Sequence, residues 1–452
     1  MRALIDQIRA YMSSQGLGPI LVRSVTGSAG LRVAGMGFTF LVGIQLARGL
    51  GAAGYGVYGL AMSIIAVLTV PTEFGLPQLL TREVAASDAR RDWGSMKGAI
   101  LWASRASLLI AFAMAGGLVL FVAWNQPTSA GDFGFALLAG TVMLPLVAQV
   151  SIRAGALRGL RRIVLGQVPD VLLRPLFHSA LLFGASGFLA LPWGPALALL
   201  LGAASAGLAL VVAQGLLIRA LPEEVRAATA ATNARAWWSS ALPMALTEGM
   251  RLLQAHVVIL MLGWLVALPE VGVYRVATSI MVLVAFPVSL FNIVSMPIVA
   301  RLHVEQDERR LQRTLTFVAL GMTVGVAILT APFAISGSSL LSLFFGTEFA
   351  SGDRIVLVLC LSALISAVFG ANAVMLNMTG AHTRVTRASA YSLLLLVVTS
   401  VPLISALGTL GAAYASLASV FTWNLLMWID CLRLRRVDTS IFSLLRMRAS
   451  DR

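Results

Sequence analysis

Charged residues are scarce in this chain of 452 residues. Asp, Glu, Lys and Arg make up 12% of it, against 58% hydrophobic residues, and the mean hydropathy is +0.89. Soluble domains carry about 25% charged residues. The composition therefore excludes an ordinary soluble enzyme, and the abundance of apolar residues excludes a disordered protein.

Residue types that often carry chemistry are also rare. The two cysteines, Cys360 and Cys431, make neither a metal site nor a disulfide framework. The single lysine, Lys97, belongs to no glycine-rich phosphate loop, and the chain has no HExxH motif and no aspartate-rich pair for metal-dependent transfer. We therefore expect no cofactor, no metal and no enzymatic activity.

Apolar stretches of membrane-spanning length occupy most of the chain. A helix needs about 20 residues to cross the hydrocarbon core of a bilayer, and the intervals between these stretches are too short for an extramembrane domain. The sequence predicts an all-α polytopic membrane protein. Its twelve expected spans lie near 28–47, 55–79, 99–123, 134–156, 170–190, 195–218, 240–263, 272–297, 314–334, 354–377, 386–405 and 410–430.

The formal net charge of +14 follows the expected topology. Of the 33 basic residues, 25 fall at the termini or in every second loop, while the loops near 124–133, 191–194 and 406–409 contain none. Because basic loops stay cytoplasmic, we expect both termini in the cytoplasm and no binding of nucleic acid. Residues 1–12 have one apolar helical face, which predicts a short helix on the cytoplasmic membrane surface.

The chain contains an internal duplication. Residues 56–71 (GVYGLAMSIIAVLTVP) match 272–287 (GVYRVATSIMVLVAFP) at seven of sixteen positions, all 216 apart. Each copy holds an even number of spans and so inserts the same way up. We expect a six-helix lobe at 1–220, a second at 221–452, and a substrate site between these parallel repeats, as in transporters.

Several charged or titratable residues fall within the predicted spans, where an arginine costs about 2.5–3.5 kcal/mol unless it faces a cavity or a partner. Arginine's planar fork suits bidentate contact with phosphate oxygens, so we predict a net-positive cavity between the lobes. Arg48, Arg275 and Arg354 are expected near outer span ends, reaching the headgroups. The predicted cavity arginines are Arg32, Arg251, Arg105, Arg153 and Arg174, and the predicted coupling or charge-pair residues are Glu73, Glu248, His178 and His256.

Other interpretations of these residues stay open. Glu248 and Arg251 are three apart on one helix and could simply pair. Arg153 and Arg174 could be the deep ends of cytoplasmic loops, and the histidines could be hydrogen-bonded packing residues. By the 216-residue offset Arg32 corresponds to Glu248, so these two could face each other across the repeat axis.

Five segments, in this order, resemble a known family. They are LARGLGAAGYGVYGLAMSI (46–64), EFGLPQLLTREVA (73–85), LSLFFGTEFASG (341–352), MLNMTGAHTRV (375–385) and LGTLGAAYASL (407–417). The chain is similar to bacterial polysaccharide-unit flippases of the Wzx type. They belong to the multidrug/oligosaccharidyl-lipid/polysaccharide (MOP) exporter superfamily, with the lipid II flippase MurJ and the MATE exporters.

The resemblance implies two six-helix lobes around a V-shaped cavity and a function in the bacterial inner membrane. The implied cargo is an undecaprenyl-pyrophosphate-linked oligosaccharide, flipped from the cytoplasmic to the periplasmic leaflet by alternating access. Arg32 and Arg251 best match the cations that would hold the pyrophosphate. Membrane lipids, a glycan polymerase and chain-length regulators are the expected partners. The alternatives are a MATE-like cation-coupled exporter and a membrane-bound glycan polymerase or ligase.

Overall fold

The structure is a computed structural model that describes residues 17–124, 131–187 and 194–444. The expected surface helix at 1–12 lies outside the described residues. The first half contains α2 (Leu17–Glu73), α3 (Leu76–Arg90), α4 (Trp93–Trp124), α5 (Asp132–Thr141), α6 (Met143–Gly159), α7 (Ile163–Gln167), the π-helix η1 (Val168–Leu173), α8 (Arg174–Gly187) and α9 (Pro195–Ala220). The second half contains α10 (Glu223–Ala227), α11 (Ala234–Leu265), α12 (Leu268–Val284), α13 (Phe286–Val304), α14 (Glu308–Phe345), the 3₁₀-helix η2 (Thr347–Gly352), α15 (Asp353–Phe369), α16 (Asn372–Met378) and α17 (His382–Arg435).

Within the described residues, all twelve predicted spans are mainly helical. Nine helical stretches of the described chain are long and apolar enough to cross a membrane. Two of them, Gly27–Arg90 and His382–Arg435, each contain two predicted spans, which join at Gly51 (φ 65°) and Gly408 (φ 59°). Glycine adopts this left-handed conformation without the strain that a side chain would add. The remaining predicted span, the fifth, is divided between η1 and α8. The fold is therefore a polytopic helical bundle, as predicted.

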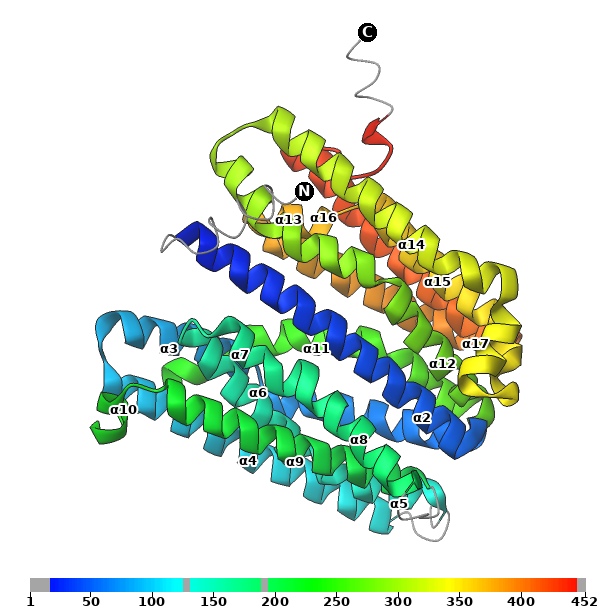
Figure 1. Cartoon of the computed structure of the whole chain (residues 1–452), viewed down its shortest axis with the longest axis horizontal. Helices are drawn as coiled ribbons and strands as arrows, with labels where there is room; N and C mark the ends of the chain where they lie inside the picture. Colours follow the sequence, from blue (N-terminus) through cyan, green and yellow to red (C-terminus); the bar gives the residue numbers. More distant parts are fainter. Residues whose placement is uncertain (1–16, 125–130, 188–193, 445–452) are drawn as a thin grey trace.

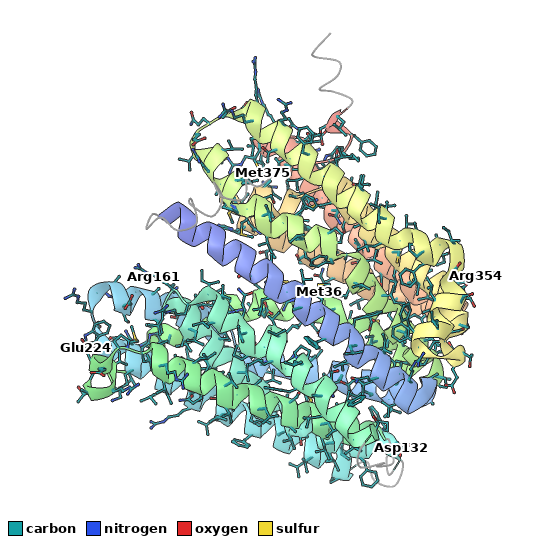
Figure 2. All side chains as sticks on the ribbon, viewed as in Figure 1. Met36, Asp132, Arg161, Glu224, Arg354 and Met375 are labelled. Atoms are coloured by element: carbon teal, nitrogen blue, oxygen red, sulfur yellow. The ribbon has the colours of Figure 1, made fainter. Side chains whose placement is uncertain are left out.

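The helices run back and forth between two ends of the bundle (Figure 1). Arg161 and Glu224 lie at one end, and Asp132 and Arg354 lie at the other (Figure 2). The connections at 160–162, 221–233, 305–307 and 379–381 all join helices at the first end, and arginines lie within them or in the adjoining helix ends, so we call it the basic end. The charge pattern of the sequence thus corresponds to one face of the folded molecule.

The duplicated segments pack directly against each other. A Cβ atom on Gly56 of α2 would lie 1.9 Å from the carbonyl oxygen of Leu268, and one on Gly272 of α12 would lie 2.1 Å from that of Ala52. Gly56 and Gly272 are 216 apart, and so are Ala52 and Leu268. The contact is therefore reciprocal, as a two-fold repeat requires, and glycine is needed because the two backbones touch.

Polar contacts join the halves near the end opposite the basic end. Arg48 of α2 donates through Nε to the carbonyl oxygen of Phe344 (2.8 Å) and also to that of Leu343. In return, the carboxylate of Glu348 in η2 accepts the backbone N–H of Ala52 at 2.7 Å. These bonds hold the kink at Gly51 against the second half.

The start of α11 packs with the first half of the chain. Trp237 and Ala241 belong to the same buried cluster as Leu76 of α3 and Met96 of α4. Further along α11, Gln254 donates to Ser392 of α17 at 2.7 Å. Helix α11 therefore bridges the two halves.

We expect Gly56→Ala and Gly272→Ala each to destabilise the protein by about 1–3 kcal/mol, the usual cost of overpacking a core. The added methyl group would overlap a backbone carbonyl that cannot move away easily. The melting temperature in detergent micelles should fall for both variants.

Gly30→Ala is the matched control, because a Cβ at Gly30 of α2 would have no atom within 4 Å. Its melting temperature should equal that of the wild type. A Gly56→Ala protein as stable as Gly30→Ala would show that the halves do not meet at this crossing.

Candidate functional site

Two adjoining cavities lie between the halves. The deep cavity has a volume of about 530 Å³ and the vestibule a volume of about 730 Å³. The vestibule reaches Pro77 and Arg158 toward the basic end, whereas the deep cavity reaches Leu46 and Tyr55. Both cavities are lined by Arg32, Met62, Met143, Asp170, Val171 and Arg174. The charges at their junction are therefore presented to both spaces.

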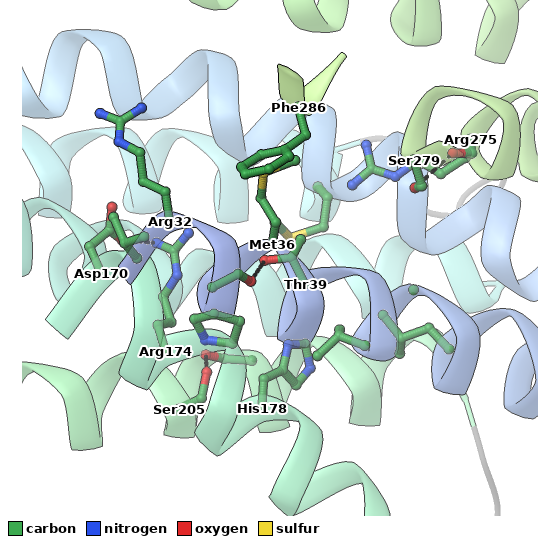
Figure 3. A pocket seen from close by; sticks show the side chains of 18 of the residues that line it. Arg32, Met36, Thr39, Asp170, Arg174, His178, Ser205, Arg275, Ser279 and Phe286 are labelled. Carbon is green, nitrogen blue, oxygen red and sulfur yellow. Dashed lines mark hydrogen bonds and ion pairs between the residues drawn. The ribbon is translucent and has the colours of Figure 1, made fainter. Parts of the chain in front are cut away.

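Arg32 projects from α2 at this junction (Figure 3). One turn further along α2, a Cβ on Gly35 would lie 2.1 Å from the carbonyl oxygen of Val171 in η1. This close approach holds α2 against the π-helix and places Arg32 beside it. The side chain is exposed to the cavity, and within the described part of the chain no ion pair or hydrogen bond is seen for its guanidinium.

Arg275 was expected near an outer span end, reaching for headgroups, and this prediction is wrong. Arg275 lies in α12 and lines the deep cavity together with Ser279 (Figure 3). The side chain is half-buried, and its Cδ would lie 3.1 Å from a Cβ on Gly59 of α2. Its guanidinium, too, shows no ion pair or hydrogen bond to any described residue.

The internal duplication indicates where the side chain of Arg275 lies. Gly59 is the residue that corresponds to Arg275 in the first copy, 216 positions earlier. Because the copies cross near their glycines, the space that Gly59 leaves empty receives the aliphatic stem of its own counterpart.

Arg174 begins α8 and pairs with Asp170 of η1, with Nη1 and Oδ1 2.9 Å apart. The two side chains are about 35% and 41% exposed, although Oδ1 of Asp170, the oxygen that faces Arg174, is buried. Asp170 was not predicted as a site residue. Its spacing of four from Arg174 is the one feature of the sequence that indicates the pair.

Arg251 lines the vestibule, where it is bound by a carboxylate. Its Nε lies 3.2 Å from both Oε atoms of Glu248, and its Nη2 also contacts Glu248. Glu73 lines the same space, and so does Arg32. Arg32 and Glu248, which the 216-residue offset relates, therefore share one cavity, and the alternative reading of Glu248 and Arg251 as a pair is confirmed.

Both predicted histidines line a cavity and have polar partners. His178 lies in the wall of the deep cavity, with Nε2 3.2 Å from the carbonyl oxygen of Ala198. His256 lies in the wall of the vestibule, with Nδ1 3.3 Å from the hydroxyl of Ser63 in the first half. These contacts join neighbouring helices.

Two predicted arginines are not in the walls of either cavity. Arg105 is exposed on α4, on the same face as Leu101, Leu109 and Phe112, whose side chains are also exposed. Arg153 of α6 lies inside the first half, where Nε donates to Gln214 of α9 at 3.0 Å. The first arginine faces outward and the second ties helices together.

A family model described as "Polysaccharide biosynthesis protein" matches residues 21–303, which is more than half of the chain. The chain belongs to this family. No curated protein matches it.

Solved structures with the same fold include transporters and a flippase. An inward-facing MATE family multidrug resistance transporter of the MOP superfamily has a TM-score of 0.69 at 13% identity, covering 90% of this chain and 98% of that one. Lipid II flippase MurJ, in an inward closed conformation, has a TM-score of 0.69 at 11% identity, covering 90% of this chain and 87% of that one. A MOP superfamily transporter from Pyrococcus furiosus has a TM-score of 0.65 at 12% identity, covering 94% of this chain and 98% of that one. This polysaccharide biosynthesis family member thus has the MOP fold, which supports a flippase or transporter.

Cysteine labelling tests the cavity directly. Ser289 of α13 is exposed and lines the deep cavity, so we expect Ser289→Cys to react with a small water-soluble maleimide. The native Cys360 and Cys431 are buried and should not react with the maleimide. Ser362→Cys, at a fully buried position of α15, should react more slowly by on the order of tenfold. Equal rates for the two variants would contradict a solvated space between the halves.

Proposed function

We propose that this protein flips undecaprenyl-pyrophosphate-linked oligosaccharide repeat units across the membrane by alternating access, with cavity arginines holding the pyrophosphate. The observation that carries the proposal is the placement of Arg32 and Arg275. They come from opposite halves, line the same deep cavity, and have guanidinium groups that no described residue neutralises.

The charges of the two cavities support an anionic cargo. Their walls contain five arginines and three carboxylates. Glu248 compensates Arg251 and Asp170 compensates Arg174. Of the three remaining arginines, Arg158 lines only the vestibule, whereas Arg32 and Arg275 line the deep cavity. A pyrophosphate diester carries about two negative charges, and each phosphate can accept a bidentate contact from a guanidinium.

The direction of transport follows from the basic end. If that end faces the cytoplasm, the protein has both termini in the cytoplasm of a bacterial inner membrane, and the vestibule is the space nearer the cytoplasm. The halves 1–220 and 221–452 would then be the bodies that rock about the Gly56–Gly272 crossing. The cargo would move to the periplasmic leaflet, where a glycan polymerase and chain-length regulators could receive it.

The alternatives fit the cavities less well. A MATE-like exporter of cations would need carboxylates to dominate the cavity walls, whereas arginines outnumber them here. A membrane-bound glycan polymerase or ligase would change the covalent structure of the lipid-linked glycan. A flippase changes only its leaflet, so the chemical state of the recovered lipid distinguishes the two.

We expect Arg32→Ala and Arg275→Ala each to abolish or strongly reduce surface glycan in a strain without the chromosomal copy, at normal protein levels. Losing one charged hydrogen-bonding partner should weaken binding of the pyrophosphate roughly ten- to a hundredfold. Glycan staining and immunoblotting of membranes check both points.

Arg105→Ala is the matched control, because Arg105 lies in a span but outside both cavities. It should make glycan at the wild-type level. The proposal is wrong if Arg32→Ala and Arg275→Ala behave like Arg105→Ala.

A further inference from the structure

Asp170 places a carboxylate at the junction of the two cavities. It lines both, as do Arg32 and Arg174, and it lies beside the guanidinium of Arg174 in Figure 3. One of the two guanidinium groups is bound to it and the other has no partner within the described chain.

The backbone holds Asp170 in this position. The residue lies in the π-helix η1, directly after Pro169, and the carbonyl of the next residue, Val171, touches the backbone of α2 at Gly35. The side chain is less constrained than the backbone: about 41% of it is exposed, and only Oδ1, the oxygen that faces Arg174, is buried. The carboxylate can therefore turn away from Arg174 while the helix stays in place.

We propose that Asp170 pairs with Arg174 until a diphosphate headgroup displaces it, and that it thereby promotes release of the headgroup. This inference rests on the proposed function. Carboxylate and phosphate oxygens are alternative acceptors for the same planar fork. The exchange replaces one anion by another, so Arg174 is never left as an uncompensated charge away from bulk water.

Such an exchange would suit a carrier, because a carrier must release what it binds. Removing a phosphate from a bare guanidinium is costly in a low-dielectric site, whereas here Asp170 returns to the arginine as the headgroup leaves. Asp170 would thus weaken binding of the diphosphate and speed its release.

The pair of Glu248 and Arg251 provides the matched control. It is also a carboxylate–arginine pair on one helix, but it lines only the vestibule. Neutralising Glu248 adds the same charge to the cavity wall without freeing Arg174. A general electrostatic effect would therefore appear in both variants, and a local exchange only at Asp170.

The experiment uses the full chain in lipid nanodiscs with farnesyl diphosphate as the probe and farnesol as the uncharged comparison. We expect Asp170→Asn to lower the Kd for farnesyl diphosphate by about tenfold, which is about 1.4 kcal/mol, and to slow its dissociation. Glu248→Gln should change the Kd by much less, and the Kd for farnesol should stay the same in both. In the Asp170→Asn/Arg174→Ala double variant the gain should disappear.

An unchanged or raised Kd for farnesyl diphosphate in Asp170→Asn overturns the inference, and so does an equal gain in Glu248→Gln. Asp170→Ser serves as a second variant if Asp170→Asn has a lowered melting temperature. Different results would contradict the proposed function. In that case wild-type protein would bind farnesyl diphosphate no better than farnesol, or Arg32→Ala and Arg275→Ala would leave the Kd for farnesyl diphosphate unchanged.

Discussion

The close crossing of α2 and α12 at Gly56 and Gly272 is the contact on which the rest of the architecture depends. Only glycine allows two helix backbones to approach this closely, and each backbone presses on a carbonyl of the other. The crossing fixes how the halves face each other. On the side toward the basic end the helices diverge enough to leave the two cavities, while Arg48 and Glu348 join the halves on the other side.

The frame is symmetric, but its charges are not. Where the first half has Arg32 the second has Glu248, and where the second half has Arg275 the first has Gly59. The duplicated scaffold therefore gives a deep cavity with one arginine from each half that is unpaired within the described chain, at different depths. A glycine on one side makes room for the arginine on the other, so the packing contact and the proposed binding group belong to the same pair of helices.

Depth along a span could be predicted from the sequence, whereas the face of each helix could not. The length of the apolar stretches predicts the twelve spans, and the glycine-containing repeat indicates the duplication from the sequence alone. Arg105 and Arg32 are both well inside spans, yet one faces outward and the other faces the cavity. In a bundle surrounded by lipid both faces of a helix are apolar, so the periodicity that separates inside from outside in a soluble protein is weak.

Local backbone changes also escaped prediction. The π-helix η1 shifts the register within the fifth span and brings Asp170 to the cavity junction beside Arg174. No sequence pattern in 163–187 predicts this π-helix. Arg275 was misplaced because its distance from the span end was considered without its counterpart Gly59. Matching the two copies residue by residue would have shown that an arginine stands opposite a glycine at the crossing.

The most direct test of the central claim is a structure of the protein in nanodiscs with undecaprenyl diphosphate bound. The account predicts density for the diphosphate in the deep cavity, with oxygens about 2.7–2.9 Å from the guanidinium nitrogens of both Arg32 and Arg275. A diphosphate bound elsewhere, or these two arginines bridged by carboxylates in a closed interior, would contradict it.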